Sequence, residues 1–564
     1  MLVLVGTHLA FALALFVAFG FNSYHPTDHG FTLGASWRVA QGEVPYLDFV
    51  WLRPPGTPYL HALAMLLPET WTLPATRLVY YLQMAGAALL PALWLTRAGT
   101  RRPRTLVIAS LIFLCIALHN FPAMAWPTVD AVFAGSAGLA ALGASITSAR
   151  HRICWRSFAS LALFAAPLFK QPFAVLPVGL LVWAAIESSG RGGRERAHLA
   201  LASLVPGALL WLTVVVALAS AGALPDSIDQ LTRASRLEDL TQAGLFAYAT
   251  ALHPAVLVFG GLLAWLALDG AADRRPAWLG TVFFGLALAG VLWLAAVPGR
   301  AGHPLFHLLL GAGLVRSFFW LRSSNRMADE PAARLARGRL VVHWGLLALG
   351  WSASISWSQQ TPLLGLAAAA VVLEDLVPHP KPRGLGRLGL AVAALVTFGF
   401  FGFENARHPY RDAPLARQTA ALHEILPRFG RIHTHPGHAE RFRDLLELIE
   451  RHATNPERAF TVMRSFPAIH FLTGRRSPVR MDWYLPLEMR GFQAEHRSEL
   501  TQLDGIVFFQ REAYVGRRPL SRRPAGDCSA SEFADSPNFV HAVFTAGRLL
   551  ESTRAFCVVE MPGR

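Results

Sequence analysis

The sequence has little charge and almost no lysine. Only 15% of its 564 residues are charged and 53% are hydrophobic, with a mean hydropathy of +0.37. Soluble domains carry about 25% charged residues, so this composition excludes an ordinary soluble protein. Lys170 and Lys381 are the only lysines among 51 basic residues. A lysine retained in a chain that otherwise uses arginine is a candidate for a specific role.

Cysteine is also scarce, and four residues are too few for a disulfide scaffold. Cys115 lies in an apolar run and Cys154 in a basic loop, whereas Cys528 and Cys557 lie in the polar C-terminal part. The last two can pair if that part lies outside the cytoplasm, and both the paired and the unpaired state stay open. The sequence contains no P-loop, HExxH or CxxC motif, and no GxGxxG before a helix.

Long apolar runs are abundant in residues 1–403 and predict a polytopic all-α membrane protein with about 13 spans. We expect spans at 2–21, 75–96, 105–119, 128–148, 157–169, 172–187, 199–221, 254–268, 278–297, 304–321, 340–357, 362–377 and 388–403. The apolar piece 57–68 is short for a crossing. A tilted, a half-embedded and an in-plane helix are all compatible with it, and so is a second short span hidden before residue 75.

Arginine gathers in short loops between the apolar runs, at 97–104, 150–156, 191–196, 274–275, 322–339 and 381–387. With the expected spans, all these loops fall on one side, which the positive-inside rule makes the cytoplasm. The N-terminus is then cytoplasmic, and the loop 22–56 lies on the outer side. The net charge of +15 is explained in this way without a nucleic-acid partner.

Residues 404–564 are polar and predict an extracytoplasmic α/β domain. Helical periodicity indicates helices at 412–429 and 437–453. Runs rich in β-branched and aromatic residues indicate strands at 460–465, 504–512, 539–546 and 555–561.

The opening loop, residues 22–56, is far longer than a connector between two membrane helices requires. Asp28 follows the end of the first span, where a carboxylate can serve as a general base. The alternative is that Thr27 or Asp28 caps the next helix. The later segment, with Arg38, Asp48 and Arg53, fits either an interfacial aromatic belt with an in-plane helix or the rim of a site that receives a lipid-borne substrate.

The motif in this loop resembles the first external loop of the GT-C superfamily of membrane glycosyltransferases. It is similar to bacterial relatives of dolichyl-phosphate-mannose–protein mannosyltransferases and of lipid A aminoarabinose transferases. The matching positions are Asp28, Gly30, Ala35, Arg38, Gly42, Pro45, Tyr46, Asp48, Phe49, Pro54, Pro55, Gly56, Tyr59 and Leu60. The resemblance covers this loop well and the multi-span body loosely.

The resemblance implies transfer of a sugar from a polyprenyl-phosphate carrier to an unknown acceptor at the outer face of a bacterial inner membrane, with inversion and with Asp28 as the base. Membrane lipids are the implied surroundings. Many relatives carry Asp-Glu where this chain has Asp28-His29. That departure leaves the acceptor class and any second acid open.

Further substrate-binding candidates lie in the outer loops. Asp130 begins a span and is either functional or a helix N-terminal charge. Lys170 is either a phosphate ligand or a snorkelling side chain. Arg300 and His303 are outer-side cations.

Metal binding and other functions remain as alternatives. His303 with His307, and the His-rich turn 433–438, are weak metal candidates, so no metal ligand is assigned although a divalent cation is compatible with the resemblance. The rival function is a lipid or sugar transporter or flippase, and a catalytically inactive scaffold is a third.

Overall fold

The structure is a computed structural model. It describes residues 1–98, 103–119, 122–148, 150–188, 192–234, 331–355, 385–463, 466–483, 491–511 and 538–563, with short pieces at 310–311, 313–315, 317–318, 528–529 and 533.

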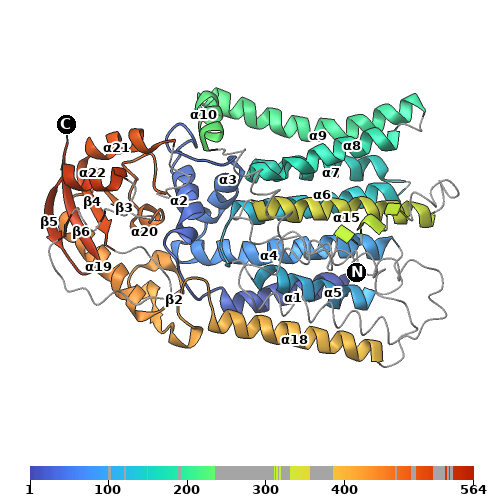
Figure 1. Ribbon diagram of the computed structural model, residues 1–564, viewed down its shortest axis with the longest axis horizontal. Helices are drawn as coiled ribbons and strands as arrows, with labels where there is room; N and C mark the ends of the chain where they lie inside the picture. Colours follow the sequence, from blue (N-terminus) through green and yellow to red (C-terminus); the bar gives the residue numbers. More distant parts are fainter. Residues whose placement is uncertain are drawn as a thin grey trace.

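Long helices run side by side in a bundle, with the N-terminus at one end and an α/β domain at the other (Figure 1). The bundle helices are α1 (Leu2–Phe19), α4 (Glu69–Arg97), α5 (Pro103–His119), α6 (Pro127–Thr147), α7 (Arg152–Phe169), η2 (Gln171–Ala174) with α8 (Val175–Ser188), α9 (Gly193–Ser220), α15 (Pro331–Ile355) and α18 (Leu385–Arg407). Within the described residues, five are long and apolar enough to cross a membrane: α1, α4, α6, η2 with α8, and α9. The chain is a polytopic helical membrane protein.

Most predicted spans are helical where the structure describes them. The spans at 254–268, 278–297 and 362–377 lie outside the described residues, and only part of 304–321 lies within them. The total of about 13 spans is therefore not established.

Small residues on α6 let its neighbours approach closely. A Cβ on Gly138 would lie 2.6 Å from Leu163 of α7, and a Cβ on Gly143 would lie 2.6 Å from Trp94 of α4. Close backbone approach supplies the van der Waals contact on which helix association in lipid depends. Alpha6 is therefore a central helix of the described bundle.

Short elements lie between the bundle and the α/β domain (Figure 1). They are α2 (Asp28–Ala40), α3 (Gly56–Ala62), η1 (Leu63–Leu66) and α10 (Leu224–Ala234). Alpha3 has 7 residues and η1 has 4, so together they are about 18 Å long, which is shorter than the roughly 30 Å hydrocarbon core of a bilayer. The exposed side chains of Leu63 and Leu66 suit a position at the interface.

The α/β domain contains a four-stranded sheet of order β3-β4-β6-β5, in which only the β3–β4 pair is parallel. Its elements are η5 (Leu415–Arg417), β1 (Ala420–Ala421), η6 (Leu422–Glu424), η7 (Pro427–Phe429), β2 (His433–Thr434), α19 (Pro436–His452), β3 (Ala459–Met463), α20 (Ile469–Thr473), α21 (Gln493–Thr501), β4 (Asp504–Gln510), α22 (Asn538–Ala546), β5 (Arg548–Ser552) and β6 (Phe556–Pro562).

Alternate residues of the strands face two separate cores. Phe508 and Val558 pack towards α19, whereas Phe509 and Val559 pack towards α22. This alternation follows from the two-residue period of a strand, and it makes the domain a sheet covered by helices on both faces.

Two predicted elements of this domain are wrong. Segment 412–429 forms short 3₁₀ turns and a two-residue strand, because Pro414 and Pro427 each remove a backbone donor. Segment 539–546 is the helix α22, since the apolar residues 539, 540, 543 and 544 follow the helical spacing and gather on one buried face. The predicted helix 437–453 and the strands near 460, 504 and 555 are confirmed.

Candidate active site at the junction of bundle and domain

Arg77 of α4 organises the chain where α1 ends. It donates to the carbonyl oxygens of Gly20 at 2.9 Å and Asn22 at 2.8 Å, and also to that of Ser23. Gly20 is the C-cap of α1, and Asn22 and Ser23 follow it in the loop, so these carbonyls have no intrahelical partners. The guanidinium thereby fixes the exit of α1 and the direction of the opening loop.

The α/β domain clamps the same turn from the other side. The backbone of His433 in β2 exchanges hydrogen bonds with Phe21 and Ser23, both 2.8 Å long. Gln418 accepts from the Ser23 N–H at 2.7 Å and donates to its hydroxyl at 2.8 Å. The opening loop and the domain are therefore joined immediately before Asp28.

Two histidines cap α2. His25 Nδ1 accepts from the Asp28 N–H at 3.3 Å, and His29 Nδ1 accepts from the His25 N–H at 2.8 Å. This exchange resembles a capping box, in which first-turn groups are satisfied reciprocally. Thr27 makes no side-chain cap bond. Neither Thr27 nor Asp28 is the side-chain cap that the sequence allowed, and His29 forms a hydrogen bond to the loop where many relatives carry a second acid.

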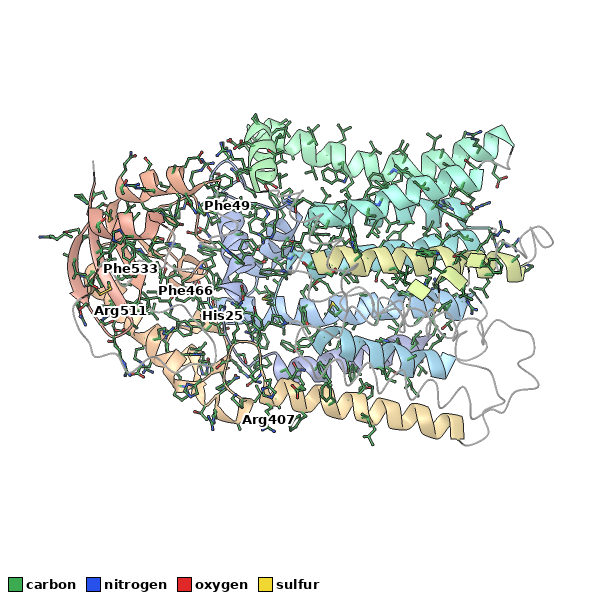
Figure 2. The ribbon with its side chains drawn as sticks, in the orientation of Figure 1. His25, Phe49, Arg407, Phe466, Arg511 and Phe533 are labelled. Atoms are coloured by element: carbon green, nitrogen blue, oxygen red, sulfur yellow. A yellow bond between two sulfur atoms is a disulfide. The ribbon has the colours of Figure 1, made fainter. Side chains whose placement is uncertain are left out.

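The Asp28 carboxylate is bound by the segment that follows the last bundle helix. Its Oδ2 accepts from the Tyr410 hydroxyl at 2.6 Å and lies 2.8 Å from Arg411 Nη1. The Asp28 side chain is 8% exposed and that of Arg411 is 47% exposed. Burial raises the pKa of Asp28, while Arg411 and Tyr410 act in the opposite direction. Figure 2 shows the neighbouring His25 at the boundary between bundle and domain.

Arg38 joins the opening loop to the domain. Its guanidinium donates to Glu43 at 2.6 Å, to Asp482 at 3.0 Å and to the Val479 carbonyl at 2.8 Å. A further bond reaches the Asp48 carbonyl at 3.0 Å. Burial alone lowers the pKa of Arg38, but the carboxylates of Asp482 and Glu43 outweigh burial and raise it. These contacts are those of a residue that holds the fold.

Asp48 closes a tight turn in the same loop. Its carboxylate accepts from the Val44 N–H at 2.6 Å, and its own N–H donates to the Val44 carbonyl at 2.9 Å. Between them Tyr46 has φ +75°, a strained backbone for a residue with a side chain. The turn carries Tyr46 inward, where its hydroxyl donates to the Arg53 carbonyl at 2.7 Å.

Arg53 lies in a cluster of aromatic rings. Its guanidinium is 4.5 Å from the centre of Phe31, 5.7 Å from Trp483 and 6.0 Å from Trp126. Phe31 lies one turn after Asp28 on α2, and Trp483 comes from the α/β domain. We call Arg53, Phe31, Trp126, Trp483 and Lys170 the cation–aromatic cluster.

Lys170 reaches the cluster from the end of α7. Its Nζ is 5.9 Å from the Trp126 ring and donates to Thr128 at 3.2 Å, and the residue is 6% exposed. The loop approaches closely here because a Cβ on Gly56 would lie 2.7 Å from the Leu168 carbonyl oxygen. Two buried cations therefore flank one indole ring beside the first turn of α2.

Asp130 binds three other helix positions. Its carboxylate accepts from Thr57 at 2.8 Å and from Gln83 at 2.8 Å, and it lies 3.2 Å from His61 Nε2. Thr57 and His61 belong to α3, and Gln83 belongs to α4. Asp130 is thus a buried link between α3, α4 and α6.

The structure describes only some of the remaining candidates for substrate and metal binding. Arg300, His303 and His307 lie outside the described residues. No group of three possible metal ligands occurs among the residues that are described. In the turn 433–438, His435 caps α19 by accepting from the Gly437 N–H at 3.1 Å.

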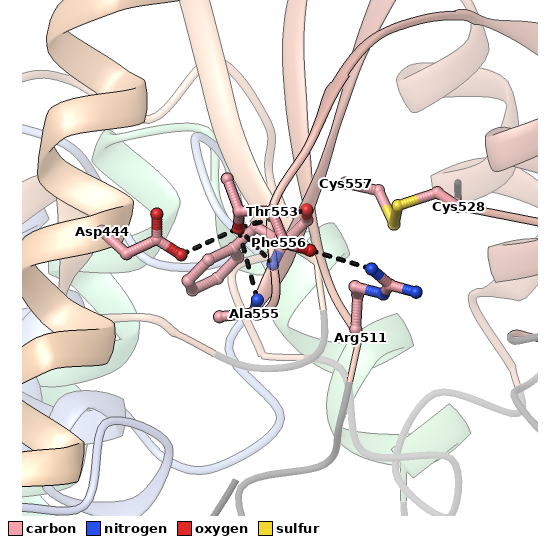
Figure 3. Close-up of a disulfide and its surroundings, with 7 residues drawn as sticks. All are labelled: Asp444, Arg511, Cys528, Thr553, Ala555, Phe556 and Cys557. Carbon is pink, nitrogen blue, oxygen red and sulfur yellow. Dashed lines mark hydrogen bonds between the residues drawn. A yellow bond between two sulfur atoms is a disulfide. The ribbon is translucent and has the colours of Figure 1, made fainter. Parts of the chain in front are cut away.

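Cys528 and Cys557 form a disulfide, with Cα atoms 6.0 Å apart. Figure 3 shows it beside the turn that leads into β6. The Thr553 hydroxyl donates to Asp444 at 2.8 Å and accepts from the Phe556 N–H at 3.1 Å, and Arg511 donates to the Thr553 carbonyl at 2.9 Å. The paired state left open by the sequence is the one adopted.

The sequence did not indicate the roles of Arg77, His25, Trp126, Tyr410, Arg411 and Trp483. Trp126 lies four residues before the candidate Asp130, and Tyr410 lies seven residues after the end of the last predicted span at residue 403. An aromatic residue and an arginine at the exit of a membrane helix usually indicate only an interfacial anchor, so their meeting with Asp28 required the fold.

Comparisons with known proteins give similar solved structures and no family. No protein-family model matches the chain, and no curated protein matches it. The solved structure of ArnT from Cupriavidus metallidurans in the apo state is similar, with 14% identity over 98% of this chain and 97% of that one and a TM-score of 0.44. At this score and identity the match carries no inference about activity.

Proposed function

We propose that the protein is a membrane glycosyltransferase of the GT-C type that moves a sugar from a polyprenyl-phosphate carrier to an acceptor at the outer face of the membrane. The observation that carries this proposal is the buried Asp28 carboxylate at the junction of the bundle and the α/β domain.

Asp28 is the proposed general base. Burial raises its pKa above the ordinary value, and a base whose pKa lies nearer the working pH accepts a proton more readily. Asp28 Oδ2 is already engaged by Tyr410 and Arg411. The acceptor therefore approaches the other carboxylate oxygen, from the water-exposed side on which Arg411 lies. Attack on the anomeric carbon forms the new glycosidic bond and expels the carrier phosphate, which keeps the electron pair.

The cation–aromatic cluster is the proposed site for the carrier phosphate. Arg53 and Lys170 lie near the same Trp126 ring. Two cations close to one ring suit an anionic group, and they stabilise the negative charge that develops on a leaving phosphate. Because Phe31 links the cluster to the first turn of α2, base and phosphate site share one rigid element.

The proposed orientation places the opening loop and the α/β domain outside the cell membrane. Several arginines of the described helices lie at the ends away from the opening loop (Figure 1), among them Arg97, Arg152, Arg194 and Arg334, whereas Arg77 and Arg407 lie near the α/β domain. The positive-inside rule favours a cytoplasmic location for that end. The disulfide at the other end favours an oxidising compartment there.

The decisive experiment compares the reconstituted wild-type protein with Asp28→Asn, using labelled polyprenyl-phosphate sugars. We expect transfer in the wild type and a loss of at least about a hundredfold in the variant, the range that general-base catalysis supplies. Glu424→Gln, at an exposed carboxylate, is the matched control and retains full activity. Undiminished transfer by Asp28→Asn contradicts the assignment of the base.

A transporter or flippase is the second candidate, favoured by the short helix α8 and by Pro167 within α7. The same vesicles distinguish it. Movement of the labelled carrier across the bilayer without transfer of sugar establishes the transporter and excludes the transferase.

A further inference from the structure

Residues 408–412 form a short strap between the membrane bundle and the α/β domain. Alpha18 ends at Arg407, and Asp412 is the first residue of the strap's far anchor. Figure 2 labels Arg407 where the last helix meets the domain. Tyr410 and Arg411 lie between these two fixed points, so the backbone that carries their side chains is restrained at both ends.

The far anchor is a buried polar cluster. Asp412 is 1% exposed and accepts from the Thr434 hydroxyl at 2.6 Å and the His435 N–H at 3.4 Å, and it lies 3.3 Å from His438 Nδ1. Burial disfavours the ionised carboxylate, but His438 and Thr434 outweigh burial and lower the pKa of Asp412. Beta2 and α19 thereby fix the end of the strap.

The strap reaches Asp28 through a strained backbone. Arg411 has φ +50°, a conformation that is unfavourable for a residue with a side chain and persists only where surrounding contacts enforce it. The enforcing contacts are the Asp412 anchor on one side and the ion pair with Asp28 on the other. Such strain is typical of residues that serve a site.

We propose that Tyr410 and Arg411 are positioning residues for Asp28, so that the α/β domain completes the active site through its strap. Both donate to the same oxygen, Oδ2, at 2.6 and 2.8 Å. Two donors on one oxygen restrain the carboxylate, and we assign the other oxygen, Oδ1, to the acceptor. Both donors also favour the ionised carboxylate, the form that accepts a proton. This inference rests on the proposed function, because it assigns the domain a part in the same site.

Three other charged or titratable side chains lie near Asp28. His25 and His29 face it from its own segment and Arg77 faces the histidines from α4. Burial and the charge of Arg77 hold the pKa of His29 well below its ordinary value, so it stays neutral while Asp28 titrates. Tyr410 and Arg411 are therefore the donors whose removal bears on Asp28 most directly.

The first test measures the pH dependence of kcat/KM in Tyr410→Phe and Arg411→Gln. Each substitution removes a donor that favours the charged carboxylate. We therefore expect the acidic limb to move to higher pH, by about half a unit to one unit for a partly exposed partner, with little change in the KM for the carrier. Arg411→Lys restores part of the shift. Arg417→Gln, at an exposed arginine of the following turn, is the control.

The second test needs no activity. The melting temperature of the protein is measured against pH, with and without Asp28→Asn. Because the pKa of Asp28 is raised on folding, the wild-type protein loses stability relative to the Asp28→Asn variant as pH rises from the unfolded pKa to the folded one. Tyr410→Phe and Arg411→Gln extend that loss to higher pH.

The outcomes separate the two proposals. Wild-type protein that transfers no sugar overturns the proposed function, and the melting experiment still reports whether the strap controls Asp28. Active protein whose acidic limb and melting difference are unchanged in both variants overturns the inference alone. A rise in kcat on removing either side chain also overturns it, because the strap would then obstruct the base.

Discussion

At the scale of single residues, arginines at the junction between bundle and domain donate hydrogen bonds to buried loop groups that water would otherwise satisfy. Arg77 satisfies three carbonyl oxygens at the end of α1, and Arg38 bonds two carboxylates and two carbonyls. Buried polar groups without partners are costly. These side chains therefore allow an irregular loop to be buried next to the membrane.

Lys170 gives a prediction about the carrier. Replacing it with Met removes one of the two cations proposed to hold the phosphate. A hydrogen bond to a charged group contributes about 1.5–3 kcal/mol, so we expect the KM for the carrier to rise roughly ten- to a hundredfold. Initial rates over a range of carrier concentrations measure it. Lys170→Arg, which retains the charge, serves as the control, and equal KM values for Lys170→Met and wild type contradict the phosphate role.

His470 makes the α/β domain sensitive to acid. Burial lowers its pKa to about 4, and its ring packs 5.1 Å from Phe460. The neutral ring is stable above the unfolded value of 6.5, and stability is lost as pH falls from there towards 4. The loss reaches roughly 3 kcal/mol.

His470→Phe should remove that loss. We expect the melting temperature of the variant to change less between pH 7 and pH 4 than that of the wild type. His423→Phe, at an exposed histidine, leaves the wild-type profile unchanged. A profile for His470→Phe identical to that of the wild type shows that the acid sensitivity lies elsewhere.

At the scale of elements, helix α2 packs directly against the α/β domain. A Cβ on Gly34 would lie 2.4 Å from the Pro467 carbonyl oxygen, so the backbones of α2 and the segment before α20 are in direct contact. Gly34→Ala should force them apart and cost about 1–3 kcal/mol of stability, as a lower melting temperature. Gly179→Ala in α8, where no atom lies within 4 Å, should be neutral or gain up to about 1 kcal/mol. Equal stability of both variants contradicts the close seating of α2.

Elements with a strong period were predictable from the sequence. For the helix 437–453 and the strands near 460 and 504, the spacing of the apolar residues and the residue types indicate the same kind of element. Segment 539–546 has apolar residues that suit a strand by type and a helix by spacing, and packing on Phe509 and Phe533 decided for the helix. Asp28, Arg53 and Lys170 could be proposed as site residues because their residue types stand out locally. Tyr410 and Trp483 could not, because their partners are hundreds of residues away in the sequence.

At the scale of the whole molecule, the disulfide links Cys528 to Cys557, which lies on strand β6 of the four-stranded sheet. Its cysteines are separated by 29 residues, and a loop of that length predicts roughly 3–4 kcal/mol of stabilisation. Replacing both cysteines with serine should therefore lower the denaturant midpoint of the domain. Reduction should do the same in the wild type and nothing further in the variant, and a midpoint that reduction does not change contradicts the prediction.

Strand order has a consequence for biosynthesis. Beta6 lies between β4 and β5 and supplies Cys557, yet it is made after both neighbours. A ribosome must therefore deliver residues 556–562 before the sheet can close. Alpha19, which together with β2 anchors the strap at Asp412, packs against Phe508 of β4 and Val558 of β6. The packing that supports this anchor is therefore complete only after β6 is made, more than five hundred residues after Asp28. We therefore expect a chain interrupted before β6 to carry Asp28 beside a strap whose anchoring helix lacks its contact with Val558.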